Sequence, residues 1–156
     1  MRRLFLILIV LLFSFTINAQ YEPVRKRYIP EPVKVIGIYA GSIILDAIGD
    51  GFCDDGYKVR GHFCQAVSTA LLVVSPFILS VDKTRWYWYV ASYLTLRIAL
   101  FDPVYNTTRG LPLDYIGSTS IWDKSLQCFN PPRSAMLWGH SVFFVIGISI
   151  PIKQLK

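Results

Sequence analysis

The sequence predicts an all-α membrane protein, namely a four-helix transmembrane bundle that follows an N-terminal signal peptide and has a loop-rich polar cap on one side. Two observations lead to this fold class. Hydrophobic residues make up 53% of the 156 residues and charged residues only 17%, and the mean hydropathy of +0.43 is too high for a soluble domain of this length. In addition, the apolar residues are gathered in long runs, as in chains that turn apolar surface toward lipid.

Residues 1–19 have the three regions of a secretory signal peptide, which are a basic start, an unbroken apolar run and small residues before a cleavage site. Arg2 and Arg3 supply the charge, and cleavage is expected after Ala19. Ile17 is larger than the side chain usually found near such a cut, so an uncleaved anchor helix is the alternative interpretation.

Residues 20–34 form a Pro-rich basic segment before the membrane domain. The segment contains three prolines, which block a regular helix and favour an extended, solvated chain. Three consecutive basic residues, 25–27, give it its charge. We therefore expect an extramembrane segment here.

The membrane domain is predicted over residues 35–152, and a short tail, 153–156, follows it. It contains four apolar runs, at residues 35–49, 63–81, 86–101 and 135–152. Because a helix needs about 20 apolar residues to cross a bilayer, the second and fourth runs qualify directly. The first and third cross only if their ends extend into neighbouring polar residues. Four aromatic residues beginning at Trp86 indicate the head-group level at the start of the third run.

Small residues four positions apart predict where the helices approach each other closely. Gly37 and Gly41 have this spacing in the first run, and Ala66 and Ala70 have it in the second. The third helix is expected to end at Asp102, because a residue that precedes proline disfavours the helical conformation.

Two polar loops, residues 50–62 and residues 102–134, are expected on the same side of the membrane, because each span reverses the direction of the chain. Together they form the predicted polar cap. Within the longer loop, Ser120 and Asp123 have the spacing of a capping box, and apolar residues at helical spacing follow. This pattern predicts a short helix that lies on the membrane surface.

The two rules for membrane orientation disagree for this chain. A signal peptide sends the mature N-terminus to the extracytoplasmic side, which places the polar cap in the cytoplasm. The positive-inside rule favours the reverse, because the side opposite the cap carries eight Lys and Arg residues and the cap side six. We follow the signal peptide, since the first segment usually sets the orientation, and predict a multi-pass protein of a bacterial-type inner membrane.

Ionisable residues inside or beside the apolar runs are the candidate functional residues. An unpaired charge at the centre of a membrane helix costs at least about 2.5 kcal/mol, so each such residue needs a partner or a watery cleft. Asp46 and Arg97 both lie about one turn from the cap end of their runs and are expected to form a structural ion pair.

In the functional interpretation, the same residues line a cleft at the membrane surface. The catalytic candidates are Asp46, Asp50, His62 and His140. The candidates for binding an anionic head group are Arg97 and Arg109. The candidate metal ligands are Asp50, Asp54 and His62, because oxygen and nitrogen ligands suit divalent metals. The sequence assigns no cofactor, since the stretch from Asp50 lacks the ligand spacing of a calcium loop.

Two functions fit these observations. The first is a non-enzymatic accessory or assembly component of the envelope, whose polar cap contacts another membrane protein. The alternative is a small membrane-embedded enzyme that acts on a lipid or a lipid-linked phosphate through the carboxylate, histidine and arginine side chains. The expected partners are the lipid bilayer and another membrane protein. The net charge of +6 does not indicate nucleic acid, because the basic residues lie at the ends of the apolar runs rather than in one patch.

Overall fold

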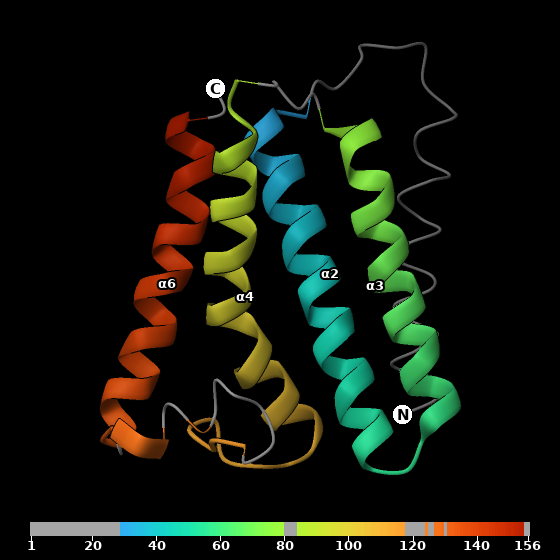
Figure 1. Cartoon of the computed structure of the whole chain (residues 1–156), viewed down its shortest axis with the longest axis vertical. Coiled ribbons are helices and arrows are strands. Elements are labelled where there is room, and N and C mark those ends of the chain that lie inside the picture. The colour runs from blue at the N-terminus through green and yellow to red at the C-terminus, as the bar shows by residue number, and fades with distance from the viewer. Residues whose placement is uncertain (1–28, 80–83, 118–123, 125–126, 130, 155–156) are drawn as a thin grey trace.

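The computed structural model describes residues 29–79, 84–117, 124, 127–129 and 131–154. Within these residues the chain is helical with connecting turns, and it has four long helices (Figure 1). The helices are α2 (Glu31–Asp54), α3 (Lys58–Ile78), α4 (Trp86–Thr108) and α6 (Arg133–Gln154). By length and composition, α2, α3 and α6 are each able to cross a membrane. The all-helical fold with several apolar spans is therefore confirmed.

The predicted signal peptide, residues 1–19, lies outside the described residues. The predicted surface helix lies mostly outside them as well. Of its residues, only Lys124 and residues 127–129 are described, and they are helical.

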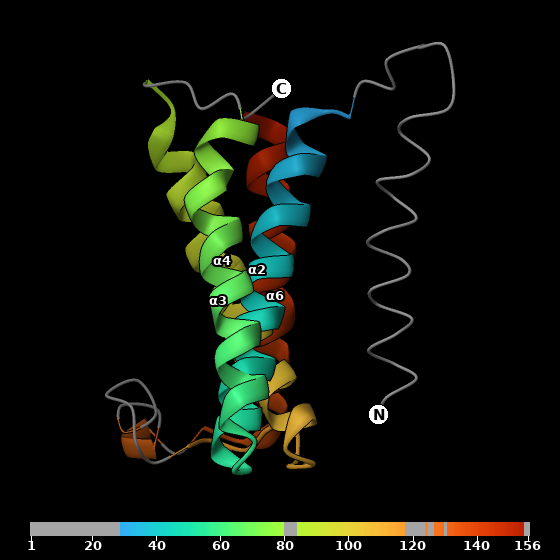
Figure 2. The same cartoon turned by 90° about the vertical axis from the view of Figure 1, so that its right-hand side faces the viewer.

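The four helices stand side by side in the order α3, α2, α4, α6 (Figures 1 and 2). Helix α2 packs against α3 on one side and α4 on the other, α4 packs against α6, and α2 and α6 also make a smaller contact with each other. Among the described residues, α3 has no contact with α4 or α6. The bundle is thus a bent row in which α2, α4 and α6 contact one another, while α3 packs against α2 alone among the long helices described.

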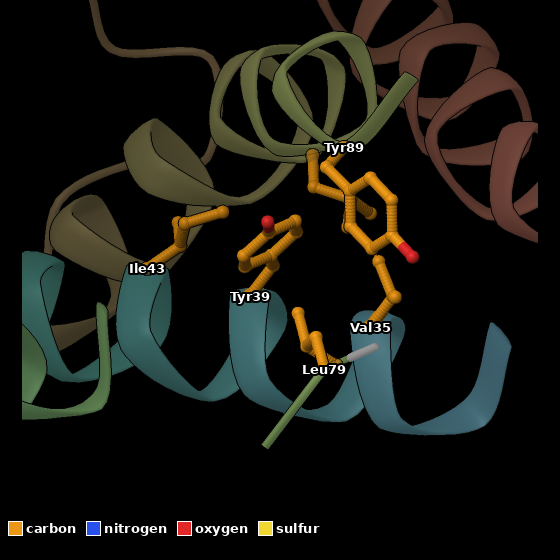
Figure 3. Close-up of a cluster of buried hydrophobic side chains, with 6 residues drawn as sticks. Val35, Tyr39, Ile43, Leu79 and Tyr89 are labelled. Atoms are coloured by element: carbon orange, nitrogen blue, oxygen red, sulfur yellow. The ribbon is translucent and has the colours of Figure 1, made fainter. Parts of the chain in front are cut away.

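The largest apolar cluster lies between α2 and α4, toward the ends at which both helices begin. Val35, Tyr39 and Ile43 follow each other at four-residue spacing and so share one side of α2. They meet Tyr89 and Leu96 of α4, and Leu79 after α3 joins them (Figure 3). The Tyr39 ring also meets the Tyr93 ring edge to face at 5.5 Å.

Small residues form the contact between α2 and α3. Gly49 and Gly61 are both buried, and a Cβ atom added to either would collide with the other helix. Farther along the same contact, the hydroxyl oxygens of Ser42 and Ser68 lie 3.0 Å apart. Absent side chains and one hydroxyl pair therefore let the two backbones approach closely, as is common between membrane helices.

The small-residue pairs that the sequence predicted at this contact do not lie in it. A Cβ atom at Gly37 or Gly41 would meet no other atom within 4 Å, and Ala66 and Ala70 are exposed. The prediction was wrong because these residues lie on sides of α2 and α3 that face away from the crossing point.

The contact between α4 and α6 also depends on a glycine. Gly147 is buried, and a Cβ atom there would lie 2.8 Å from the side chain of Leu96. The Ser92 hydroxyl donates a hydrogen bond to the Gly147 carbonyl at 3.0 Å. A missing side chain and a serine donor thus join these helices.

Helix α2 is longer at both ends than the first apolar run. It begins at Glu31, so the expected extended segment over residues 20–34 is wrong for its last four residues. Pro32 is accommodated because the first turn of a helix needs no hydrogen bond from its backbone nitrogen. At the other end, α2 continues to Asp54, and the predicted loop 50–62 shortens to residues 55–57. Gly56 makes this tight turn possible with a φ angle of +87°.

Helix α4 does not end before Pro103 as expected but continues to Thr108. Contacts beyond the proline hold this extension in place. The Asn106 side chain is buried, and its amide donates hydrogen bonds to the carbonyls of Leu113 (3.3 Å) and Tyr115 (2.9 Å). The local preference at Pro103 is therefore overridden, and the predicted loop 102–134 begins only at residue 109.

Candidate functional site

The ends of α2 and α4 and the beginnings of α3 and α6 lie at one end of the row, which we name the cap end (Figure 1). The two predicted polar loops, residues 50–62 and 102–134, therefore lie between helix ends on the same side of the row. The candidate site residues lie on this half of the row or in its turns, except Arg97, which is the middle residue of α4.

Asp46 and Arg97 form an ion pair between α2 and α4. Arg97 Nη1 lies 2.7 Å from Asp46 Oδ2, and the two side chains are 37% and 26% exposed for arginine and aspartate respectively. The same guanidinium lies 3.5 Å from the Tyr93 hydroxyl and stacks over the Phe101 ring at 4.5 Å. Arg97 thus has a carboxylate, a hydroxyl and an aromatic face as partners.

Side chains at four-residue spacing continue this contact along α4 to the cap end. Phe101 and Tyr105 stack almost in parallel, with an interplanar angle of 7° and ring centroids 6.3 Å apart. Arg109 lies over the Tyr105 ring at 5.7 Å, and its Nη1 donates to the Tyr105 hydroxyl at 3.0 Å. Residues four apart lie on one side of a helix, so Arg97, Phe101, Tyr105 and Arg109 form one continuous ladder.

Arg109 connects the end of α4 to the end of α2. Its Nε donates to Asp55 Oδ1 at 3.2 Å, and its Nη1 lies 3.6 Å from Asp54 Oδ2. The Tyr105 hydroxyl donates to the same Asp54 carboxylate. Hydrogen bonds to Tyr105 and Asp55 raise the pKa of the Arg109 guanidinium, and an arginine is cationic at physiological pH even without such a shift. The ladder ends in a second ion pair rather than in an open anion site.

Asp50 and His62 are joined through Gln65, which the sequence reasoning missed. Gln65 Nε2 donates to Asp50 Oδ1 at 2.5 Å, and Gln65 Oε1 lies 3.0 Å from His62 Nδ1. Because the amide nitrogen is used by Asp50, the amide oxygen faces the imidazole, so His62 Nδ1 must be the donor. The signal that could have found Gln65 is its spacing, three residues after His62 and so on the same side of a helix.

The thiol of Cys53 lies near the same imidazole, with Sγ 4.0 Å from His62 Nδ1. A nucleophilic cysteine needs a histidine nitrogen that can accept its proton. Since Nδ1 donates to Gln65, it has no lone pair for the Cys53 thiol. This contact therefore does not form a Cys–His catalytic pair.

His140 belongs to a different contact from the other candidates. It lies on α6, and its Nδ1 donates to the Ile98 carbonyl of α4 at 2.8 Å. Its Nε2 is buried and has no hydrogen-bond partner among the described residues. This bond lies one turn before Pro103, where the missing backbone donor weakens the helix. His140 thus supports α4 from α6.

The candidate residues do not converge on one point. Asp46 pairs with Arg97, Asp50 reaches His62 only through Gln65, and Asp54 pairs with Arg109. Within the described part of the chain, no three His, Cys, Asp or Glu side chains are placed to share a metal ion. The arrangement is suited to hold α2, α3 and α4 together at the cap end.

The hydrogen bonds of Gln65 make a specific prediction about stability. Gln65→Leu removes the donor to Asp50 and the acceptor for His62, and we expect the free energy of unfolding to fall by about 1 kcal/mol. Gln65→Glu keeps the size of the side chain but places a second carboxylate against Asp50. At pH 7 the glutamate variant should lose more unfolding free energy than the leucine variant. This loss should become smaller at acid pH, because protonation removes the repulsion between the carboxylates. Unfolding in mixed detergent micelles at pH 7 and pH 5 measures both effects.

Comparison with known protein families, with curated proteins and with solved structures finds no match to this chain. Its function is therefore inferred from the geometry of the helices and of the cap end.

Proposed function

We propose that this protein is a non-enzymatic integral membrane protein, an accessory or assembly component of a bacterial-type envelope, whose polar cap contacts another membrane protein. The observation that supports this proposal most is that Arg97 and Arg109 are both in ion pairs. An enzyme acting on an anionic lipid would need such side chains for the substrate, yet both are engaged by carboxylates of α2. These arginines connect helices instead of lining an open site.

The proposed membrane topology has four crossings, with the mature N-terminus outside and the polar cap in the cytoplasm. Helix α4 lies between α2 and α6 in the row, so it crosses if its two neighbours cross. With 23 residues it is about 35 Å long, which is enough for a bilayer core of about 30 Å. Its Arg97 is tolerated because Asp46 neutralises it.

One observation favours the alternative, a small membrane-embedded enzyme that acts on a lipid phosphate. The chain from Asp50 through Gln65 fixes the imidazole of His62 by its Nδ1, and His62 itself is exposed. A histidine held in this way presents its other nitrogen to solvent as a base or a metal ligand. In that case Asp50 and His62 would be the acting residues, without His140.

Site-specific photo-crosslinking distinguishes the two functions. A photoreactive residue at Tyr115, which is exposed near the cap end, should give one discrete protein adduct in native membranes. The same group at Tyr87, exposed at the opposite end of α4, is the matched control and should not give that adduct.

The enzyme alternative predicts a different result. Purified protein would then contain a divalent metal in stoichiometric amount, and Asp50→Ala would remove the metal while the helix content stayed unchanged. That finding, together with equal crosslinking at Tyr115 and Tyr87, would overturn the proposed accessory function.

A further inference from the structure

Three basic side chains at the cap end form no ion pair with a described residue, and they are Lys58, Arg60 and Lys124. Lys58 and Arg60, in the first turn of α3, are exposed, and neither forms an ion pair with a described residue. The other arginines of the cap end are all paired. Arg97 pairs with Asp46, Arg109 with Asp54 and Asp55, and Arg133 with Asp114. Two of the three unpaired positive charges of the cap end therefore lie next to each other at the start of α3, and Lys124 is the third.

These two charges lie among exposed apolar side chains. Val59, between them, is 85% exposed, and Phe63, one turn later, is 57% exposed. The guanidinium of Arg60 lies 5.1 Å above the ring of Tyr57, which is itself half exposed. Basic side chains mixed with exposed aliphatic and aromatic ones are typical of the boundary between hydrocarbon and water, because the apolar part enters the lipid and the charge stays at its surface.

The length of α3 places its first turn at that boundary. The helix has 21 residues and is about 31 Å long, close to the thickness of about 30 Å of a bilayer core. Exposed apolar side chains continue toward its other end at Val73, Val74 and Phe77. If these residues contact the acyl chains, the first turn of α3 lies at the level of the lipid phosphates. This position favours a lipid over an acidic segment of another protein as the partner of Lys58 and Arg60.

We propose that Lys58 and Arg60 bind the phosphate groups of anionic phospholipids at the turn between α2 and α3. The two side chains follow a turn of three residues, 55–57, and their charges are not neutralised by the carboxylates nearby. Tyr57 orients Arg60, and Val59 and Phe63 anchor the same turn in the hydrocarbon. The protein thus selects anionic lipids around α3, independently of any protein partner of the cap.

Lipid selectivity of the reconstituted protein tests this proposal. The full chain is placed in nanodiscs of phosphatidylcholine with a minor fraction of spin-labelled phosphatidylglycerol, and the relative association constant of the anionic lipid is measured. Each basic side chain removed should weaken the selectivity about fivefold, so Lys58→Gln with Arg60→Gln should weaken it roughly 30-fold. Arg133→Gln is the matched control, because it removes one positive charge at the same end from a side chain already paired with Asp114. Its selectivity should equal that of the wild type.

A charge-preserving variant separates lipid binding from effects on folding. Lys58→Arg with Arg60→Lys keeps both charges and should retain the selectivity. The proposal is wrong if the double glutamine variant selects phosphatidylglycerol as well as the wild type does. It is also wrong if the wild type shows no preference for phosphatidylglycerol while polyglutamate binds to the wild type and not to the double glutamine variant, because the partner would then be an acidic protein segment.

Discussion

Replacing Arg97 by glutamine is expected to lower the free energy of unfolding in detergent micelles by about 2–3 kcal/mol, because the Asp46 carboxylate is then left without its counter-charge. This is less than the loss expected for a fully buried pair, since both side chains retain some exposure to solvent. Arg97 also loses its contact with the Phe101 ring, which adds to the effect. Asp46→Asn should be destabilising for the same reason, because it leaves the Arg97 guanidinium unpaired.

The double variant, Asp46→Asn with Arg97→Gln, shows whether the pair serves structure or chemistry. The double variant leaves no charge without a counter-charge at this contact, so we expect it to be more stable than either single variant. Thermal unfolding of the four proteins gives the coupling energy. Strictly additive losses would mean that Asp46 and Arg97 do not support each other, and the structural role of the ion pair would have to be abandoned.

Replacing Gly61 by alanine is expected to separate α2 from α3 and to cost about 2–3 kcal/mol of unfolding free energy. A Cβ atom at Gly61 would collide with the Cys53 sulfur and with the carbonyl oxygen of Gly49. The cysteine side chain can turn aside, but the Gly49 carbonyl belongs to the backbone of α2, so the whole helix must move. The effect should be large because α2 is the only long helix that α3 contacts in the described structure.

Gly41→Ala is the matched control for this substitution. It adds the same methyl group to a helical glycine of α2, but nothing lies within 4 Å of the new Cβ atom. Alanine favours the helix over glycine, so a gain of up to about 1 kcal/mol is expected instead of a loss. Unfolding of both variants in the same detergent checks the prediction. Equal stability of the Gly61 and Gly41 variants would show that α2 and α3 do not pack closely at this point.

An ion pair could be predicted from the sequence where the two charged residues lie at the same distance from the cap end of their apolar runs. Asp46 and Arg97 are each about one turn from the cap end of an apolar run, and a charge in that position needs a counter-charge. Gln65 and Tyr105 could not be found in the same way. Both are neutral, so neither needs a counter-charge, and Tyr105 also lies beyond the predicted end of the third run at residue 101.

Helix ends were predicted poorly for a related reason. The sequence rule for Asp102-Pro103 is a local preference of modest energy. Helix α4 passes through this point because Asn106 binds the carbonyls of the following loop and Tyr105 stacks on Phe101. Contacts of the residues that follow the proline, with Phe101 and with the loop after the helix, therefore decide where the helix ends.

The sequence by itself determined that this chain forms long apolar helices and that their charged ends gather on the same side. These properties follow from the lengths of the apolar runs and from the reversal of direction at each turn. Only the tertiary structure decided that α3 packs against α2 alone among the long helices described. It also decided that Gly49 and Gly61 lie at the contact of these two helices, while Gly37 and Gly41 do not. The reason is physical. A small residue lets two helices approach closely only where it faces the partner helix, and which residues face the partner depends on how the two helices cross.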